Sequence, residues 1–217
     1  SIDPDVYLGG MPRERATTVE GVVFDGIPYV EFLDLPLLRG DEPPEDGYVA
    51  AYQLPWPGSI AILSSPEDTG YVPRTQVTSP AVMGTTLDPL PEGPLGVFDR
   101  ANRLRVAVAG GELSSVTELQ LLAGANAAAL QNEAGGWEVL QFLDAELIEA
   151  GTYELSGLLR GQGGTELEQR APLAEGAAFV LLGGVARVRL APDEVGLPLF
   201  WRYGPATRDI SDRSYAT

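Results

Sequence analysis

The sequence predicts an all-β protein made of small β-barrel or β-sandwich modules, with many short strands and little helix. Short apolar runs are separated by turn signals at intervals of about 8 to 12 residues, a spacing typical of all-β domains. The 26 glycines and 18 prolines supply those turns and leave little room for long helices. A chain of 217 residues buries about 70% of the surface that it exposes when unfolded, so we expect packed cores.

The first third of the chain alternates short apolar runs with proline-rich or acidic turns. It predicts, in order, a linker or extended segment over 1–31, two short strands split by an Asp-Gly turn within 22–38, an acidic loop over 39–47, and strands over 48–54 and 59–65.

The middle of the chain gives a weaker pattern. Residues 71–98 contain five prolines that space out short apolar runs, so we expect an irregular crossover between two β units. Alternation over 103–111 predicts a strand. Residues 112–131 fit two patterns, and we expect a helical turn or an irregular strand before Gly124, followed by a strand from Ala127.

Residues 136–166, GWEVLQFLDAELIEAGTYELSGLLRGQGGTE, predict a long strand, a turn over 149–152, and a second strand that pairs back on the first. Leu158 and Leu159 interrupt the alternation of the second strand, which indicates either a bulge or burial on both faces.

The last part of the chain predicts a hairpin over 177–190, turning at Gly183-Gly184, and a final strand over 198–205. We divide the chain into the linker, a first β module over 32–97, a second over 98–195 that carries the long motif, and a closing strand and tail over 196–217.

The residue types that are missing exclude several kinds of site. The chain has no Cys, His or Lys, since all 14 basic residues are arginine. Thiol nucleophiles, disulfides, His or Cys zinc sites, Ser-His triads and the P-loop lysine are therefore excluded. An acidic loop contains four carboxylates without the spacing of a calcium-binding loop, so we expect no metal and no cofactor; these residues are Asp41, Glu42, Glu45 and Asp46.

The formal charge of −17 argues against nucleic-acid binding, because a duplex binder needs a cationic surface. Anionic membrane surfaces repel such a chain for the same reason. No run of about 18 apolar residues is present, so we expect no membrane span.

Arg160 stands at the end of the long motif, among glycines. Its guanidinium can tie down carbonyls of a tight loop or a carboxylate such as Glu138 or Glu166, or it can grip an anion. We favour the structural role, because the loop has no lysine and no following helix to cradle a phosphate. The structural motif comprises Trp137, Arg160, Gly161, Gly164 and Thr165.

No catalytic residue is evident, and we expect the protein not to be an enzyme. Among 31 acidic residues, some pair will reach the roughly 5 Å spacing of a retaining glycosidase by chance, and nothing selects one. Trp56, Trp201 and Tyr203 are weak candidates for binding sugar rings, since alternation puts the last two on one strand face. We favour packing in a core or a subunit interface for these rings.

Several motifs, in this order, resemble the carboxy-terminal region of the large tail-tip hub protein of gene transfer agents and related siphophages, also called the host-specificity or megatron protein. They are FLDLPLLRGDE (32–42), PWPGSIAIL (55–63), GTTLDPLPEGPLGVFDRANRLRV (84–106), WEVLQF with YELSGLLRGQGGTE (137–166) and RYGPATRDISDRSY (202–215). The upstream part of such hub proteins, including a glycosidase-like barrel, has no counterpart here, so the resemblance implies a fragment.

That resemblance implies a structural component of a phage-like tail tip or baseplate, a homotrimer in that family, near the end that meets the host envelope. Its partners would be other tail proteins and the envelope, with DNA passing through without specific binding, and its location would be the particle tail. Two alternatives remain open: an extracellular carbohydrate-binding β module and a glycosidase that uses carboxylates alone.

Overall fold

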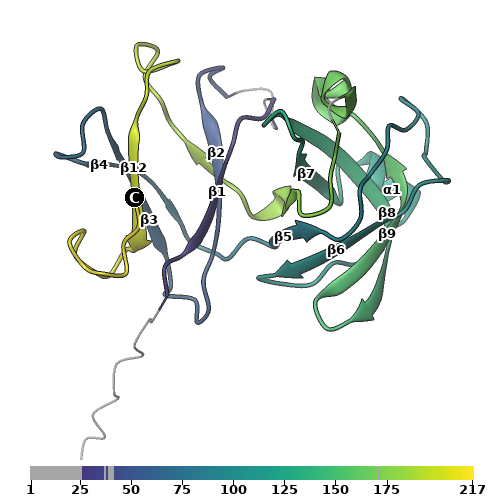
Figure 1. Ribbon diagram of the computed structural model, residues 1–217, viewed down its shortest axis with the longest axis horizontal. Helices are drawn as coiled ribbons and strands as arrows, with labels where there is room; N and C mark the ends of the chain where they lie inside the picture. The colour runs from purple at the N-terminus through teal and green to yellow at the C-terminus, as the bar shows by residue number, and fades with distance from the viewer. Residues whose placement is uncertain (1–25, 37, 39–41, 171) are drawn as a thin grey trace, which may run out of the picture.

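The computed structural model describes residues 26–36, 38, 42–170 and 172–217. The protein is all-β, as predicted, with 42% of residues in strands and 9% in helices. The strands form a closed barrel and two three-stranded sheets. These lie in a row, with the sheet β1-β2-β11 between the barrel and the sheet β12-β3-β4 (Figure 1).

The barrel has the strand order β10-β5-β6-β9-β8-β7, and every neighbouring pair is antiparallel. Its strands are β5 (Met83–Thr86), β6 (Leu104–Ala109), β7 (Ala127–Gln131), β8 (Trp137–Glu149), β9 (Thr152–Leu159) and β10 (Ala178–Leu181). Short helices lie in the connections: α1 (Glu118–Leu122) and the 3-10 helices η2 (Gln162–Gly164), η3 (Glu166–Arg170) and η4 (Leu182–Gly184).

The two small sheets are also antiparallel. Their strands are β1 (Tyr29–Leu33), β2 (Gly47–Tyr52), β3 (Ile60–Ser65), β4 (Val72–Val77), β11 (Ala186–Val188) and β12 (Phe200–Pro205). A core of buried Val49, Ile60 and Ile62 lies between these sheets.

Strand β8 is buried on both faces in its first half. Leu140 and Phe142 point into the core inside the barrel, whereas Trp137 and Val139 pack with residues of the neighbouring sheet. Because successive side chains of a strand point to opposite faces, this one strand joins the barrel to the sheet β1-β2-β11.

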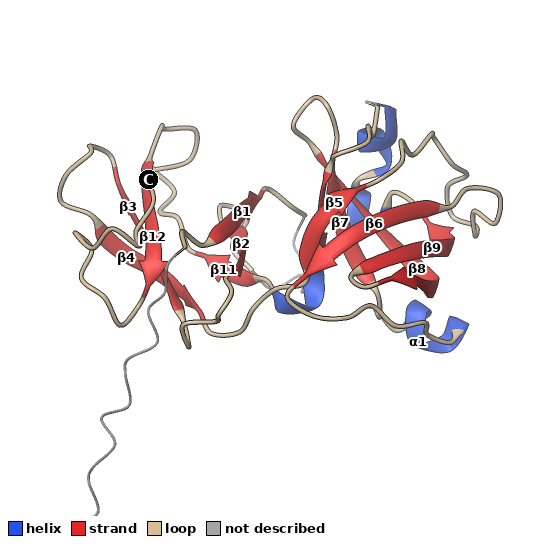
Figure 2. Cartoon of the chain, turned by 60° about the horizontal axis from the view of Figure 1, so that its bottom comes forward, coloured by secondary structure: helices blue, strands red, loops and turns tan. Residues whose placement is uncertain are grey.

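The irregular alternation at Leu158 and Leu159 comes from burial on both faces of the strand, one of the two causes that the sequence allowed. Leu158 lies in the barrel core, and Leu159 packs with Leu121 of α1 and Leu143 of β8. Burial on both faces therefore replaces alternation. Figure 2 shows α1 beside the strands that it covers, β8 and β9.

The prediction of an irregular crossover over 71–98 was wrong, because β4 and β5 both lie in that range. Strand β4 contains Pro73, which it tolerates because it is an edge strand and its register shifts opposite that residue. Strand β5 contains Gly84, where an added Cβ would lie 1.8 Å from the carbonyl oxygen of Ala107 on β6. Because proline and glycine are uncommon within strands, their presence made β4 and β5 difficult to predict from the sequence.

The predicted hairpin over 177–190 was also wrong. Strand β10 pairs with β5 and β7 in the barrel, whereas β11 pairs with β2 in the neighbouring sheet. The two apolar runs are strands, but the glycines between them lie in η4, and the chain crosses there from one sheet to another.

Other local predictions are confirmed. A helical turn, α1, precedes Gly124, and a strand, β7, begins at Ala127. The turn between β8 and β9 pairs Ala145 with Leu155, as the long motif predicts. Of the linker predicted over 1–31, residues 1–25 lie outside the described residues, and so does the first of the two strands expected within 22–38; Tyr29–Glu31 form the start of β1.

The modules predicted at 32–97 and 98–195 exchange strands. From the first range, β5 joins the barrel, and from the second, β11 joins the sheet of β1 and β2. The domain boundaries stay a prediction.

Candidate functional site

Arg160 and Glu138 form a buried ion pair at the end of the barrel core. Arg160 Nε donates to Glu138 Oε1 at 2.6 Å, and Nη2 donates to Oε2 at 2.8 Å. Neither side chain is exposed to solvent. Glu138 lies on the same face of β8 as Leu140 and Phe142, so its carboxylate points into the barrel. The fork-to-fork geometry is the strongest that this pair of groups can adopt.

The remaining groups at this pair are also hydrogen-bonded. Arg160 Nη1 donates to the carbonyl of Pro91 at 2.8 Å, and the backbone N–H of Gly161 donates to Glu138 Oε1 at 3.1 Å. The guanidinium thus joins β9, β8 and the segment before β6. Because its charge is matched by Glu138 and its side chain is fully enclosed, Arg160 has no exposed side on which to bind a ligand.

The other residues of the predicted motif surround this pair. The hydroxyl of Thr165 donates to the carbonyl of Gln162 and accepts from the N–H of Val139 on β8. Gly161 has a positive φ, and an added Cβ would lie 2.8 Å from Cα of Glu166. Trp137 is buried, whereas Gly164 is exposed and is needed for its φ of +92°.

Asp99 extends the network. Its Oδ1 accepts from the backbone N–H groups of Ala101 and Asn102, and its Oδ2 accepts from the side-chain amide of Asn102 at 2.7 Å. Burial acts to raise the pKa of Asp99, but these hydrogen bonds and the nearby positive charge of Arg160 together lower it below its ordinary value. Asp99 is therefore held as a carboxylate.

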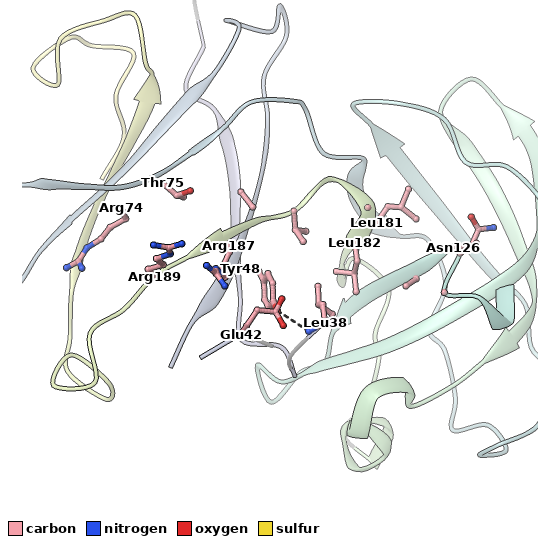
Figure 3. Close-up of a pocket in the computed structure, with 16 residues that line it drawn as sticks. Leu38, Glu42, Tyr48, Arg74, Thr75, Asn126, Leu181, Leu182, Arg187 and Arg189 are labelled. Atoms are coloured by element: carbon pink, nitrogen blue, oxygen red, sulfur yellow. Dashed lines mark hydrogen bonds between the residues drawn. The ribbon is translucent and has the colours of Figure 1, made fainter. Parts of the chain in front are cut away.

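A cleft of about 1090 Å³ lies where the three sheets meet (Figure 3). One part is lined by three arginines: Arg74 of β4, Arg187 of β11, and Arg189 just after β11. Leu38, Glu42 and Tyr48 line the middle, and Leu181, Leu182 and Asn126 line the barrel side. Cationic side chains therefore meet an apolar and amide surface in one cleft.

Carboxylates hold two of these arginines. Arg74 donates through Nη1 to Glu194 Oε2 at 2.9 Å, and its Nη2 donates to Oε1. The Arg74 guanidinium and the backbone N–H of Ala191 lower the pKa of Glu194. Arg187 Nε lies 3.2 Å from Oδ2 of Asp46, which is almost fully buried. These contacts fix where the two guanidinium groups stand.

Several donors in the cleft are unused within the described part of the chain. The two terminal nitrogens of Arg187 donate no hydrogen bond to a described residue, and neither does any nitrogen of Arg189. Among the described lining residues, Glu42 is the one carboxylate, and it accepts from the hydroxyl of Tyr48 at 2.8 Å. The chemistry available here is that of binding an anion.

The aromatic candidates lie together only in part. Trp201 and Tyr203 of β12 pack against the core between the small sheets, with the Trp201 ring 4.6 Å from that of Phe32. Trp56 packs on the same core. All three are half-buried, whereas Phe200, on the opposite face of β12, is 46% exposed. The three rings therefore form packing contacts rather than an exposed row.

Two other kinds of site are absent from the described ranges. No group of three or more carboxylates there is placed to hold a metal ion. Among the same residues, no helix has the length and apolar character needed to cross a bilayer.

The arginine-lined cleft was not predicted from the sequence. One signal was available, because Arg187 and Arg189 alternate with apolar residues and so share a strand face. Arg74 gave none, since it lies more than a hundred positions away and meets Glu194 only through the sheet arrangement.

Comparison with known families matches part of the chain. A family model described as "Rcc01698-like, C-terminal" matches residues 81–180, which span the barrel from β5 into β10. No significant match to a curated protein was found. Over its barrel, the chain is therefore similar to a family whose name is associated with gene transfer agents.

Proposed function

We propose that this chain is a non-enzymatic structural component of a phage-like tail tip or baseplate hub, near the end that contacts the host envelope and delivers DNA. The observation that carries the proposal is the match of the barrel to the Rcc01698-like family. Two of the motifs that resemble hub proteins, at 84–106 and 137–166, lie within the matched residues. The other three lie outside it and extend the resemblance to the small sheets.

The structure of the motif supports a mechanical role. Its one buried arginine holds β8, β9 and the segment around Pro91 together, and its side chain is enclosed by the protein and not open to a substrate. Such a node stiffens the barrel, which a component that transmits force during attachment requires.

The proposal includes assembly into a homotrimer through exposed apolar side chains. Leu147 and Ile148, near the tip of the β8–β9 hairpin, are 60% and 52% exposed, and Leu119 and Leu122 of α1 are more exposed still. Exposed apolar side chains that gather on a surface mark interaction sites, and these four are our candidates for the subunit contact. The carbohydrate-binding alternative needs an exposed aromatic row, and the packing of Trp201 and Tyr203 gives it no support.

Light scattering on the purified chain at several concentrations tests the assembly. We expect three times the monomer mass, and we expect Leu147→Glu combined with Ile148→Glu to reduce it to the monomer mass. Leu54→Glu is the matched control, because Leu54 is 79% exposed but lies in the loop after β2. A monomer at all concentrations would argue against the trimer.

A further inference from the structure

The cleft between the sheets combines features that the proposed function does not use. The chain carries a formal charge of −17, yet three of its arginines line one concavity. Low-dielectric walls focus the potential of charges that line a cleft, so a local positive site can attract an anion even in an acidic protein.

The donors are partly preorganised. Asp46 holds Arg187 through Nε, which leaves the two terminal nitrogens for another acceptor. Arg189 follows two positions later, just beyond β11, and lines the same cleft with no hydrogen bond or ion pair to a described residue. Arg74 is already bound to Glu194 and Ser64, so the donors for a ligand are those of Arg187 and Arg189.

The geometry suits a phosphate group. A guanidinium presents paired N–H donors that match two phosphate oxygens, and such charge-assisted hydrogen bonds are about twice as strong as neutral ones. The opposite wall, with Leu182, offers apolar contact to an uncharged body, whereas the amide nitrogen of Asn126 already donates to the carbonyls of Ser114 and Phe142. The volume of about 1090 Å³ is near the upper end of ordinary small-molecule pockets.

We propose that this cleft binds a phosphate monoester of about sugar size, with the phosphate on Arg187 and Arg189 and the body against the barrel wall. The proposal rests on the cleft alone and stands or falls independently of the tail-tip role. No bond is made or broken in it.

Isothermal titration of the full chain tests it, with glucose 6-phosphate as the probe, glucose as the uncharged comparison and glycerophosphocholine as a phosphodiester. We expect saturable one-to-one binding of glucose 6-phosphate and none of glucose. Arg189→Gln should weaken the binding by roughly tenfold, the worth of one charge-assisted hydrogen bond. Arg103→Gln should change it less than about twofold, because Arg103 is an exposed barrel arginine paired with Glu154.

Arg189→Gln and Arg103→Gln remove the same charge. A difference between their affinities for glucose 6-phosphate is therefore due to the position of Arg189 in the cleft and not to the change in net charge. Arg189 is exposed and without partners among the described residues, so its variant should keep the fold, which circular dichroism checks. The proposal is overturned by absence of saturable binding up to about 10 mM. Equal weakening in both variants, or tighter binding of the phosphodiester, would also overturn it.

Discussion

Glu138 and Arg160, 22 positions apart, form a doubly hydrogen-bonded ion pair that is sealed from solvent at the end of the barrel core. Each partner is costly to bury alone, since an unpaired buried charge loses its hydration without compensation. The glycine loop after β9 and the carbonyl of Pro91 are organised around this pair.

Removing one partner should therefore destabilise the protein strongly. We expect Arg160→Met to lower the free energy of unfolding by about 3–5 kcal/mol, because it leaves the Glu138 carboxylate buried and unpaired. Arg103→Met, at an exposed pair with Glu154, should cost at most about 1 kcal/mol. Urea denaturation measures both values, and equal values would contradict the account of Arg160 as a strut.

Barrel closure between β5 and β6 depends on Gly84. A Cβ at this position would meet the carbonyl of Ala107 at 1.8 Å, and backbone atoms cannot give way cheaply. We expect Gly84→Ala to cost at least about 3 kcal/mol or to prevent folding. Gly183→Ala is the control, since an added Cβ meets nothing within 4 Å there. Thermal unfolding measures both variants. If Gly84→Ala unfolds at the same temperature as Gly183→Ala and the wild type, the pairing of β5 with β6 is wrong.

The aromatic strand β12 gives a test of packing against ligand binding. Trp201 packs on Phe32 between the two small sheets, whereas Phe200 points outward from the same strand. We expect Trp201→Ala to cost about 2–4 kcal/mol, below the value for a fully buried ring, and Phe200→Ala to cost less than about 1 kcal/mol. If chemical denaturation ranks the two variants the other way round, the packing assignment of Trp201 is wrong.

Acid should destabilise the protein through Asp99. Since its folded-state pKa lies below the ordinary value of 3.8, the unfolded chain takes up a proton at higher pH than the folded chain does. The stabilisation is complete above that ordinary value and is lost as the pH falls through the folded-state pKa. Urea midpoints measured from about pH 6 down to about pH 2.5 should fall on acidification.

Single substitutions isolate the contribution of Asp99 to the pH dependence of stability. Asp99→Asn should flatten the acid branch of the stability curve, whereas the same change at exposed Asp34 should leave its slope as in the wild type. An unchanged slope in Asp99→Asn would remove Asp99 from the acid-sensitive groups.

The sequence predicted what local patterns encode. Alternation and turn residues located β6, β7, β8, β9 and β12, because these strands present apolar residues at regular spacing to a core. The glycine loop after Arg160 likewise indicated a constrained backbone, and Gly161 and Gly163 both have positive φ.

What the sequence concealed depends on contacts between distant segments. Pro73 in β4 and Gly84 in β5 argue against strands when only the sequence is known. The edge position of β4 explains the proline, and the close approach of Ala107 explains the glycine. Strands β10 and β11 belong to different sheets because each pairs with strands far along the chain. The local sequence shows only two apolar runs around glycines, which predict a hairpin. The cleft brings Arg74 together with Arg187 across the sheets, and the alternation around Arg187 and Arg189 was the one local signal of it.

We propose that this chain belongs to the tail tip of a phage-like particle. Electron microscopy of purified particles from the producing cells, labelled with an antibody raised against residues 81–180, tests it most directly. We expect gold label at the distal end of the tails, in particles that contain DNA. Particles without label at the tail end, with the protein recovered only in the cell fraction, would contradict it.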